Sequence, residues 1–308
     1  MSVGVESRER AATARSRVRR LPKGAIGYVF IAPWLIAFLA FEALPILSGF
    51  YHSFTDWTAT GKAARWVGFA NYVEALTNDP LFWKAVTNTF YYIGVSVPLG
   101  IVVAFILALM LNTKLRGSGV YRTIYYLPSV VPTVAAVIVW TFIFETRRGI
   151  LNFVLELLGL PVIRWLSDPA WAMPALIIMS LWGLGASMII FLAGLQGIPA
   201  ELYEAAEVDG ATSWRKLWTI TVPLMTPTIF FNLIMSLVAA FQAFNNAFIM
   251  TNGGPNNATL LYMLHLYNNA FHYFRMGYAS AMAVMLFAVV FTVTLLVYRS
   301  SRRWVYYS

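Results

Sequence analysis

The sequence predicts an all-α membrane protein with six transmembrane helices, and three observations lead to that fold class. Of the 308 residues, 59% are hydrophobic and only 11% are charged, whereas about 25% of the residues in a soluble domain are charged. The mean hydropathy is +0.67. The apolar residues also fall into six continuous runs, and a run of about 20 residues crosses a hydrocarbon core at 1.5 Å per residue. Continuous rather than alternating runs argue against β-strands.

The six predicted spans contain almost no charged residues and cover 25–50, 86–111, 123–144, 170–200, part of 217–250, and 277–298. Two prolines, Pro128 and Pro132, lie inside the third span. No Asp, Glu, Lys or Arg occurs between Leu217 and Phe274, so charge does not delimit the fifth span. We expect this span to begin near Pro227 and to end before the turn-forming sequence Thr-Asn-Gly-Gly-Pro at 251–255.

The distribution of basic residues predicts the orientation of the chain. Of the 22 Lys and Arg residues, 15 lie before the first span, between spans 2 and 3, between spans 4 and 5, or after span 6. By the positive-inside rule these segments face the cytoplasm. We therefore expect a cytoplasmic basic segment at 1–24, a transmembrane domain at 25–300 and a cytoplasmic tail at 301–308. This topology accounts for most of the net charge of +9, and nucleic-acid binding is not needed to explain it.

The sequence lacks the residue patterns of several kinds of chemistry. It has no cysteine and no G-x-x-x-x-G-K-[ST] phosphate loop. The histidines, at 52, 265 and 272, do not have the spacing of metal ligands, and the spans contain no pair of carboxylates for proton or sodium coupling. We predict a chain that is not an enzyme and that holds no metal or cofactor of its own. If it moves a solute against a gradient, another subunit supplies the energy.

The loop between spans 4 and 5, at 199–223, predicts two short helices joined by a glycine turn. Pro199 suits a helix start and Gly210 a helix stop, and Thr212 or Ser213 can cap the second helix, which we expect to end at Pro223. Glutamates at 201, 204 and 207 should share one face of the first helix.

This loop resembles the E-A-A loop of ABC importer membrane subunits. The matching residues are Glu204-Ala205-Ala206, then Gly210, then Ile220-x-Val222-Pro223, where Val222 replaces the leucine of the usual pattern. Further segments resemble the sugar-importer branch, which includes the larger maltose and glycerol-3-phosphate permeases. These are 66–72, 79–83, 88–89, 251–255 and 277–281.

The resemblance implies a permease subunit in the cytoplasmic membrane of a bacterium or archaeon, surrounded by membrane lipid. Its implied partners are a second homologous permease, two ATPase subunits that bind ATP and Mg²⁺, and an extracytoplasmic sugar-binding protein, either periplasmic or lipid-anchored. Phosphorylated sugars, disaccharides and oligosaccharides share this scaffold. The residues implied in coupling to the ATPase are Glu204, Ala205, Ala206, Asp209 and Gly210.

The fifth span also contains candidate sugar-binding residues. Gln242, Asn245 and Asn246 have i, i+3, i+4 spacing, so a continuous helix would place their amides on one face. Sugars need amides or hydroxyls beside apolar surface. The resemblance adds Trp182, Gly185 and Ser187 of the fourth span. Three alternatives stay open: these amides hold helices together, Asn245 and Asn246 already lie near the outer interface, or the partner permease provides the sugar site.

Two further classes of function compete with the importer subunit. A self-sufficient secondary carrier or channel is the main alternative, and a membrane-embedded enzyme is the third.

Overall fold

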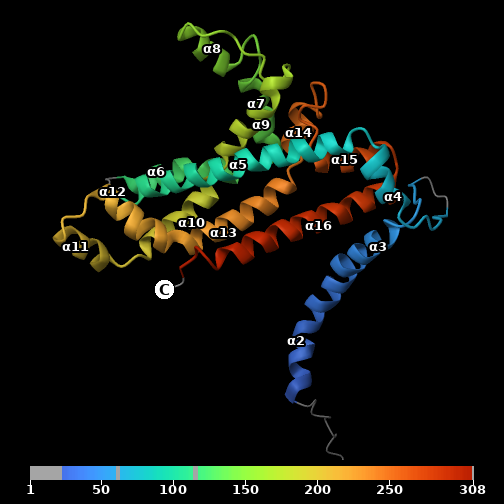
Figure 1. Ribbon diagram of the computed structural model, residues 1–308, viewed down its shortest axis with the longest axis horizontal. Helices are drawn as coiled ribbons and strands as arrows, with labels where there is room; N and C mark the ends of the chain where they lie inside the picture. The colour runs from blue at the N-terminus through green and yellow to red at the C-terminus, as the bar shows by residue number, and fades with distance from the viewer. Residues whose placement is uncertain (1–22, 60–62, 114–116, 307–308) are drawn as a thin grey trace, which may run out of the picture. The chain divides into compact units, whose positions relative to one another are not determined.

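The computed structural model describes residues 23–59, 63–113 and 117–306. Nearly all of the predicted 1–24 segment and the last two residues of the predicted 301–308 tail lie outside these residues. The chain divides into two units, Met1–Tyr51 and His52–Ser308. The described residues are mostly helical, and their β-structure is one isolated bridge between Thr55 and Trp66 (Figure 1). The predicted all-α class is confirmed.

The first unit is one helix with a widened turn. It comprises α2 (Lys23–Phe38), the π-helical turn η1 (Leu39–Ala43) and α3 (Leu44–His52), whose last residue begins the second unit. The stretch Phe30–His52 is long and apolar enough to cross a membrane. Its large apolar side chains are exposed, as expected for a lipid-facing or partner-facing span.

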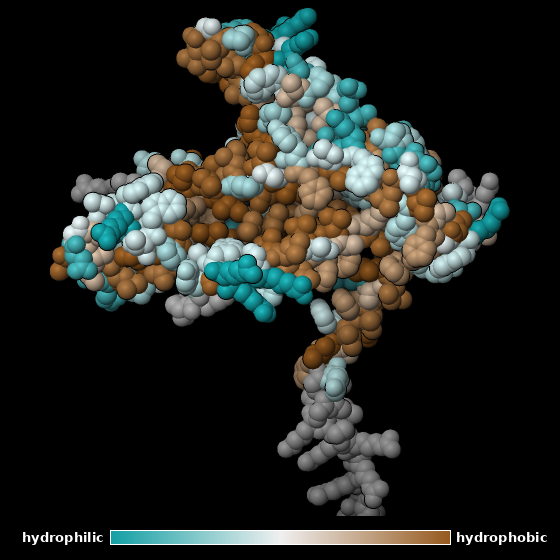
Figure 2. Space-filling view, in the orientation of Figure 1, coloured by the Kyte–Doolittle hydropathy of each residue, from teal (hydrophilic) through white to brown (hydrophobic). Residues whose placement is uncertain are grey.

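The second unit is built around α5 (Phe82–Leu111), which packs against α9 (Pro169–Trp182), α10 (Gly185–Gln196) and α13 (Val222–Phe241). The last helix, α16 (Met276–Ser301), packs against α13. One end of the unit carries α11 (Ala200–Val208) and α12 (Ser213–Lys216), and the other carries α4 (Ala70–Val73) and α15 (Tyr262–Tyr267) (Figure 1). Apolar side chains cover the middle of this unit, and hydrophilic ones gather at the α11–α12 end (Figure 2).

Two predicted spans are bent rather than straight. The third consists of α6 (Ser118–Tyr126) with the 3₁₀ turn η3 (Leu127–Val130), followed at 99° by α7 (Thr133–Ile143). Pro132 explains the bend, because it lacks a backbone donor and forces Val131 into an extended conformation. The fourth bends by 49° between α9 and α10. Among the described residues, four helices are therefore long and apolar enough to span a membrane, or up to six if each bent pair is one span.

The fifth span begins earlier than Pro227, so that expected boundary is wrong. The chain stays helical from α12 through the π-helical turn η4 (Leu217–Thr221) into α13, and no helix ends at Pro223. Pro223 lies in the first turn of α13, where a missing N–H is tolerated. Pro227 cannot donate to the carbonyl of Pro223, but the hydroxyl of Thr226 donates to that oxygen at 2.6 Å.

The remaining elements connect these helices. The π-helical turn η2 (Glu74–Asn78) continues α4, and α8 (Ile150–Leu157) lies between α7 and α9 and projects from the unit (Figure 1). The fifth span ends with α14 (Asn245–Met250), and the fifth-to-sixth connection contains α15 and the π-helical turn η5 (Asn268–His272). The predicted turn at 251–255 is confirmed by positive φ angles at Asn252 and Gly253.

Candidate functional site

The α11–α12 loop has the predicted helix–glycine–helix form. Gly210 has a φ of +73°, a left-handed conformation that glycine adopts without steric penalty. The amide of Ala211 donates to the carbonyl of Ala206 at 2.8 Å, and the amide of Gly210 donates to that of Glu207 at 3.0 Å. These two bonds form a Schellman motif, which satisfies the last carbonyls of α11.

Side-chain contacts fix the two short helices to each other. The ammonium of Lys216 donates to a carboxylate oxygen of Glu207 at 2.6 Å. The hydroxyls of Tyr203 and Thr221 are 2.9 Å apart, which ties α11 to η4. The hydroxyl of Thr212 accepts from the amide of Arg215 at 3.3 Å, so the predicted N-cap of the second helix is confirmed. The loop therefore has one defined shape.

The predicted coupling residues form an accessible surface in this chain. Glu204, Ala205, Asp209 and Gly210 are exposed, and Ala206 is half-buried. Large apolar side chains nearby are also exposed, including Val208 at 89% and Trp214 at 69%. Contiguous exposed apolar residues often mark a protein interface. Coupling by these residues stays a prediction at this point.

The predicted amide face of the fifth span does not form, because the helix is interrupted there. Helix α13 ends at Phe241, and α14 begins only at Asn245 after Phe244 adopts a φ of −137°. The i, i+3, i+4 argument for Gln242, Asn245 and Asn246 is therefore wrong, since it requires a continuous helix. Gln242 and Asn245 are exposed and Asn246 is half-buried.

The candidate residues of the fourth span lie at its bend. Trp182 ends α9 and Gly185 begins α10, and Ser187 is half-buried. A Cβ atom on Gly185 would lie 2.7 Å from the carbonyl oxygen of Tyr125 and 2.8 Å from the Cα of Tyr126. Gly185 is thus a close-packing position against α6, a role common for small residues in membrane helices.

A small cavity of about 200 Å³ lies next to both interruptions. Its lining includes Leu184 from the break between α9 and α10, and Ala243 from the break after α13. The hydroxyl groups of Ser96, Ser180 and Ser236 supply polar atoms among its lining residues. Sequence spacing did not indicate these serines, because they come from three different helices. Interrupted helices beside a cavity are a recurrent form of solute site in transporters.

At the α4–α15 end, segments that are distant in sequence are joined by hydrogen bonds. The amide nitrogen of Asn88 donates to the carbonyls of Asn257 and Leu260 at 2.8 and 3.1 Å. The amide of Tyr262 donates to the hydroxyl of Thr89 at 2.8 Å. The pair 88–89, singled out in the sequence, therefore anchors the 251–261 loop to α5.

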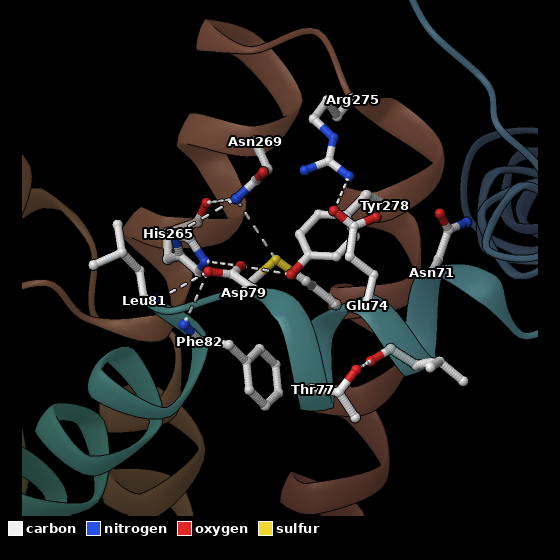
Figure 3. A network of polar contacts seen from close by, with 12 residues as sticks. Asn71, Glu74, Thr77, Asp79, Leu81, Phe82, His265, Asn269, Arg275 and Tyr278 are labelled. Atoms are coloured by element: carbon white, nitrogen blue, oxygen red, sulfur yellow. Dashed lines mark hydrogen bonds and ion pairs between the residues drawn. The ribbon is translucent and has the colours of Figure 1, made fainter.

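Asp79 is the centre of a polar network at the same end (Figure 3). Its Oδ2 accepts hydrogen bonds from Tyr278 at 2.6 Å and from His265 Nε2 at 2.7 Å, and its Oδ1 accepts from the amides of Leu81 and Phe82. Burial alone would raise the pKa of Asp79, but these hydrogen bonds outweigh it and hold the pKa below its ordinary value. Beside this network, Arg275 and Glu74 form an ion pair in which the guanidinium nitrogen and the carboxylate oxygen are 2.6 Å apart.

Sequence reasoning missed this network. Asp79 lies in the 79–83 segment and Tyr278 in the 277–281 segment, both of which resemble the sugar-importer permeases. His265 lies 186 positions from Asp79 and belongs to neither segment. A single sequence does not show that such residues meet. Among the described residues, no group of three or more His, Asp or Glu side chains could hold a metal ion.

Long apolar helices, a cavity beside two interrupted spans and a helical loop at one end define a membrane-spanning transport subunit. The chain belongs to the family of binding-protein-dependent transport system inner membrane components, which matches residues 96–306. Members of this family are the non-catalytic membrane subunits of ABC importers. The chain is thus a permease, as the resemblance of its loop implied.

Individual relatives and solved structures agree with this assignment. The chain is 41% identical to the probable ABC transporter permease protein YesP of Bacillus subtilis (strain 168), over 96% of this chain and 97% of that protein. It is 36% identical to the lactose transport system permease protein LacF of Rhizobium radiobacter, over 95% and 99%. A bacterial alginate ABC transporter, solved with an alginate-bound periplasmic protein, contains a chain with a TM-score of 0.79 and 26% identity, covering 90% of this chain and 94% of that one.

Proposed function

We propose that this chain forms half of the translocation pathway of an ATP-driven sugar importer and that its α11–α12 loop docks onto an ATPase subunit. The observation that carries the coupling proposal is the rigid shape of this loop around Gly210, combined with the exposure of Glu204 and Val208. A short exposed helix can sit in a groove of a partner and transmit a rigid-body movement. Glu204 would pair there with a basic residue.

The assembly contains a second homologous permease, two ATPase subunits that hold ATP and Mg²⁺, and an extracytoplasmic sugar-binding protein. Relatives support a sugar as the solute: one is named for lactose, another for trehalose and maltose, and a third for arabino-oligosaccharides. The chain crosses a bacterial or archaeal cytoplasmic membrane six times, with each bent pair counted as one span and both termini in the cytoplasm. This orientation places the α11–α12 loop on the side where ATP is available.

The sugar passes the interruptions of the fourth and fifth spans. The cavity at these breaks supports this placement, because unwound helix ends and serine hydroxyls offer hydrogen-bonding groups to a polar solute. Alanine substitution of Gln242, Asn245 and Asn246, one at a time, tests their contribution. Loss of uptake with retained ATPase stimulation by the loaded binding protein supports a role in sugar binding, and unchanged uptake in all three variants refutes it.

The coupling proposal is tested with a matched pair at Gly210. A Cβ atom there meets no atom within 4 Å, so substitution acts through backbone conformation rather than crowding in this chain. A left-handed φ costs about 1–2 kcal/mol for an ordinary L-residue, whereas asparagine tolerates it. Gly210→Val should leave ATPase activity uncoupled from uptake, and Gly210→Asn should retain most of the coupling. Normal uptake by Gly210→Val contradicts the proposal.

Co-purification and labelling test the assembly and the orientation. An importer subunit isolated from its native membrane should bring a nucleotide-binding protein with it, and transport by this chain alone without ATP would identify a secondary carrier instead. Single cysteines at Thr77 and Thr212 should react with an impermeant thiol reagent from opposite sides. Labelling of both from outside contradicts the proposed topology.

A further inference from the structure

A polar cavity of about 410 Å³ lies among the loop after α14, helix α15 and turn η5. This volume falls within the roughly 300–1,000 Å³ of small-molecule sites. It is separate from the small cavity at the helix breaks, since the two share no lining residue. Its lining combines three asparagines, two histidines and several aromatic rings, and includes no Asp, Glu, Lys or Arg. An uncharged polar solute fits this composition better than an ion or a phosphorylated compound.

The three asparagines have free hydrogen-bonding capacity. Within the described part of the chain, the side-chain amides of Asn252, Asn257 and Asn268 form no hydrogen bond, although each can donate twice and accept twice. Asn252 and Asn257 have φ angles of +48° and +56°, which places them in a tightly turned loop. Because Asn88 holds the carbonyl of Asn257, that part of the loop is fixed to α5.

The histidine at the inner wall of the cavity is also fixed. His265 is buried, and its Nε2 is bound to Asp79 at 2.7 Å, so the ring is held in one orientation (Figure 3). Such support from behind a lining residue is typical of built binding sites.

Four aromatic rings join this cavity to the interrupted fifth span. Phe244 and Phe248 stack with ring centroids 5.0 Å apart, Phe248 and Tyr267 are 5.3 Å apart, and Tyr267 and Phe271 are 5.1 Å apart. Phe244 lies at the start of α14, beside Asn245, and Phe271 is 58% exposed. The rings thus run from the predicted sugar-binding residues to the surface. Apolar ring faces of a sugar pack on aromatic rings, and its hydroxyls suit neighbouring amides.

We propose that this cavity is an entry site for uncharged carbohydrate, in which a sugar ring rests on Tyr267 and Phe271 while its hydroxyls bind the amides of Asn252, Asn257 and Asn268. The aromatic series then leads the sugar toward the break after α13. The inference rests on the proposed importer function and extends it, because it adds a second binding site ahead of the one at the helix breaks.

The chain contains no cysteine, so a single Asn268→Cys residue can be modified selectively in the assembled importer with cysteine-free partner subunits. The rate of modification by a small cationic methanethiosulfonate is measured with and without an equimolar mixture of maltose, trehalose and lactose. At about 100 mM total sugar, a site with a Kd of about 10 mM is occupied enough to slow the reaction roughly tenfold. Glycine betaine at equal osmolarity serves as the solute control.

Thr77→Cys is the matched protein control. It is exposed at the same end of the unit but does not line the cavity, and its side chain points away from His265 (Figure 3). Sugar should protect the cysteine at 268 and leave the one at 77 unaffected. Equal rates with and without sugar overturn the inference, as does an unreactive cysteine at 268 in the sugar-free importer, because an entry site must be open to solute.

Two other outcomes distinguish an entry site for sugar from a protein contact surface and from a failure of the proposed importer function. Protection at position 268 by the sugar-free binding protein, but not by sugar, overturns the inference because the surface is then a protein contact. Absence of an associated ATPase refutes the proposed function whatever the labelling result. Lack of sugar protection in an importer whose ATPase responds to its binding protein refutes the entry site alone.

Discussion

Replacing Asp79 by alanine tests whether its network holds the α4–α15 end together. The substitution leaves two buried donors without their acceptor, the hydroxyl of Tyr278 and Nε2 of His265. Each unsatisfied buried donor costs about 1–3 kcal/mol, so Asp79→Ala should lower the free energy of unfolding by roughly 2–6 kcal/mol. The amides of Leu81 and Phe82 add little to this figure if water replaces the carboxylate.

The measurement is reversible unfolding of the purified full-length chain in mixed micelles at increasing mole fractions of dodecyl sulfate, followed by far-ultraviolet circular dichroism at pH 7. Asp56→Ala is the control, because Asp56 is an exposed acidic residue: its ion pair with Arg65 spans 4.0 Å, and its Oδ1 accepts a solvent-exposed hydrogen bond from the amide of Arg65 at 2.6 Å. A surface pair of this kind contributes about 0–1 kcal/mol.

A double-mutant cycle isolates the hydrogen bond itself. Tyr278→Phe removes one donor and should cost about 0.5–1.5 kcal/mol. In the Asp79→Ala/Tyr278→Phe protein the orphaned hydroxyl is absent, so the combined loss should be about 1 kcal/mol smaller than the sum of the single losses. Strict additivity, or an Asp79→Ala protein as stable as the Asp56→Ala control, refutes this reasoning.

Four further predictions concern stability. Acidification should weaken the Asp79 network, because the pKa of Asp79 is lower in the folded chain than in the unfolded chain. The stabilising contribution of Asp79 is full above the ordinary pKa of 3.8 and is lost as the pH falls through the lower folded value. A titration of the unfolding midpoint against pH would show this loss. Asn88→Ala removes two hydrogen bonds to the 251–261 loop and should speed proteolysis there, with unchanged cleavage counting against the anchoring role. Gly277→Ala would make a Cβ overlap with the backbone carbonyl oxygen of Thr55 and should destabilise the chain by about 1–3 kcal/mol, so a thermal midpoint equal to wild type contradicts the packing. Glu207→Gln should change stability by less than about 1 kcal/mol, since that carboxylate is 63% exposed, and a larger loss would show that the loop is less exposed than described.

Much of the fold could be predicted because apolar runs and turn residues act locally. The uncharged run at 86–111 is α5, and Gly210 has the positive φ that its position after an acidic helix predicts. The loop at 251–255 turns where asparagine and glycine permit left-handed conformations. In each case the determining residues lie within a few positions of the feature.

The features that were missed depend on tertiary contacts. The break after Phe241 contains neither glycine nor proline, and its neighbour α14 packs against α7, so packing rather than local propensity decides where the helix ends. The serine-lined cavity and the Asp79–His265 contact each join residues from different helices. Residue spacing within one helix therefore predicted the wrong geometry for Gln242, Asn245 and Asn246, and a sugar site on the fourth and fifth spans stays a prediction.

The continuity of α12, η4 and α13 has a mechanical consequence. From Ser213 to Phe241 the chain is one uninterrupted helix of roughly 44 Å, whereas α11 is joined to it through the turn at Gly210. Because the Lys216–Glu207 and Tyr203–Thr221 contacts fix α11 to this helix, a displacement of the loop would move α11 and the helix together. The far end of the helix, at Ser236, Ala239 and Ala240, lines the serine-lined cavity. If the loop docks on an ATPase subunit as proposed, its displacement would therefore reach the wall of that cavity through a single continuous helix.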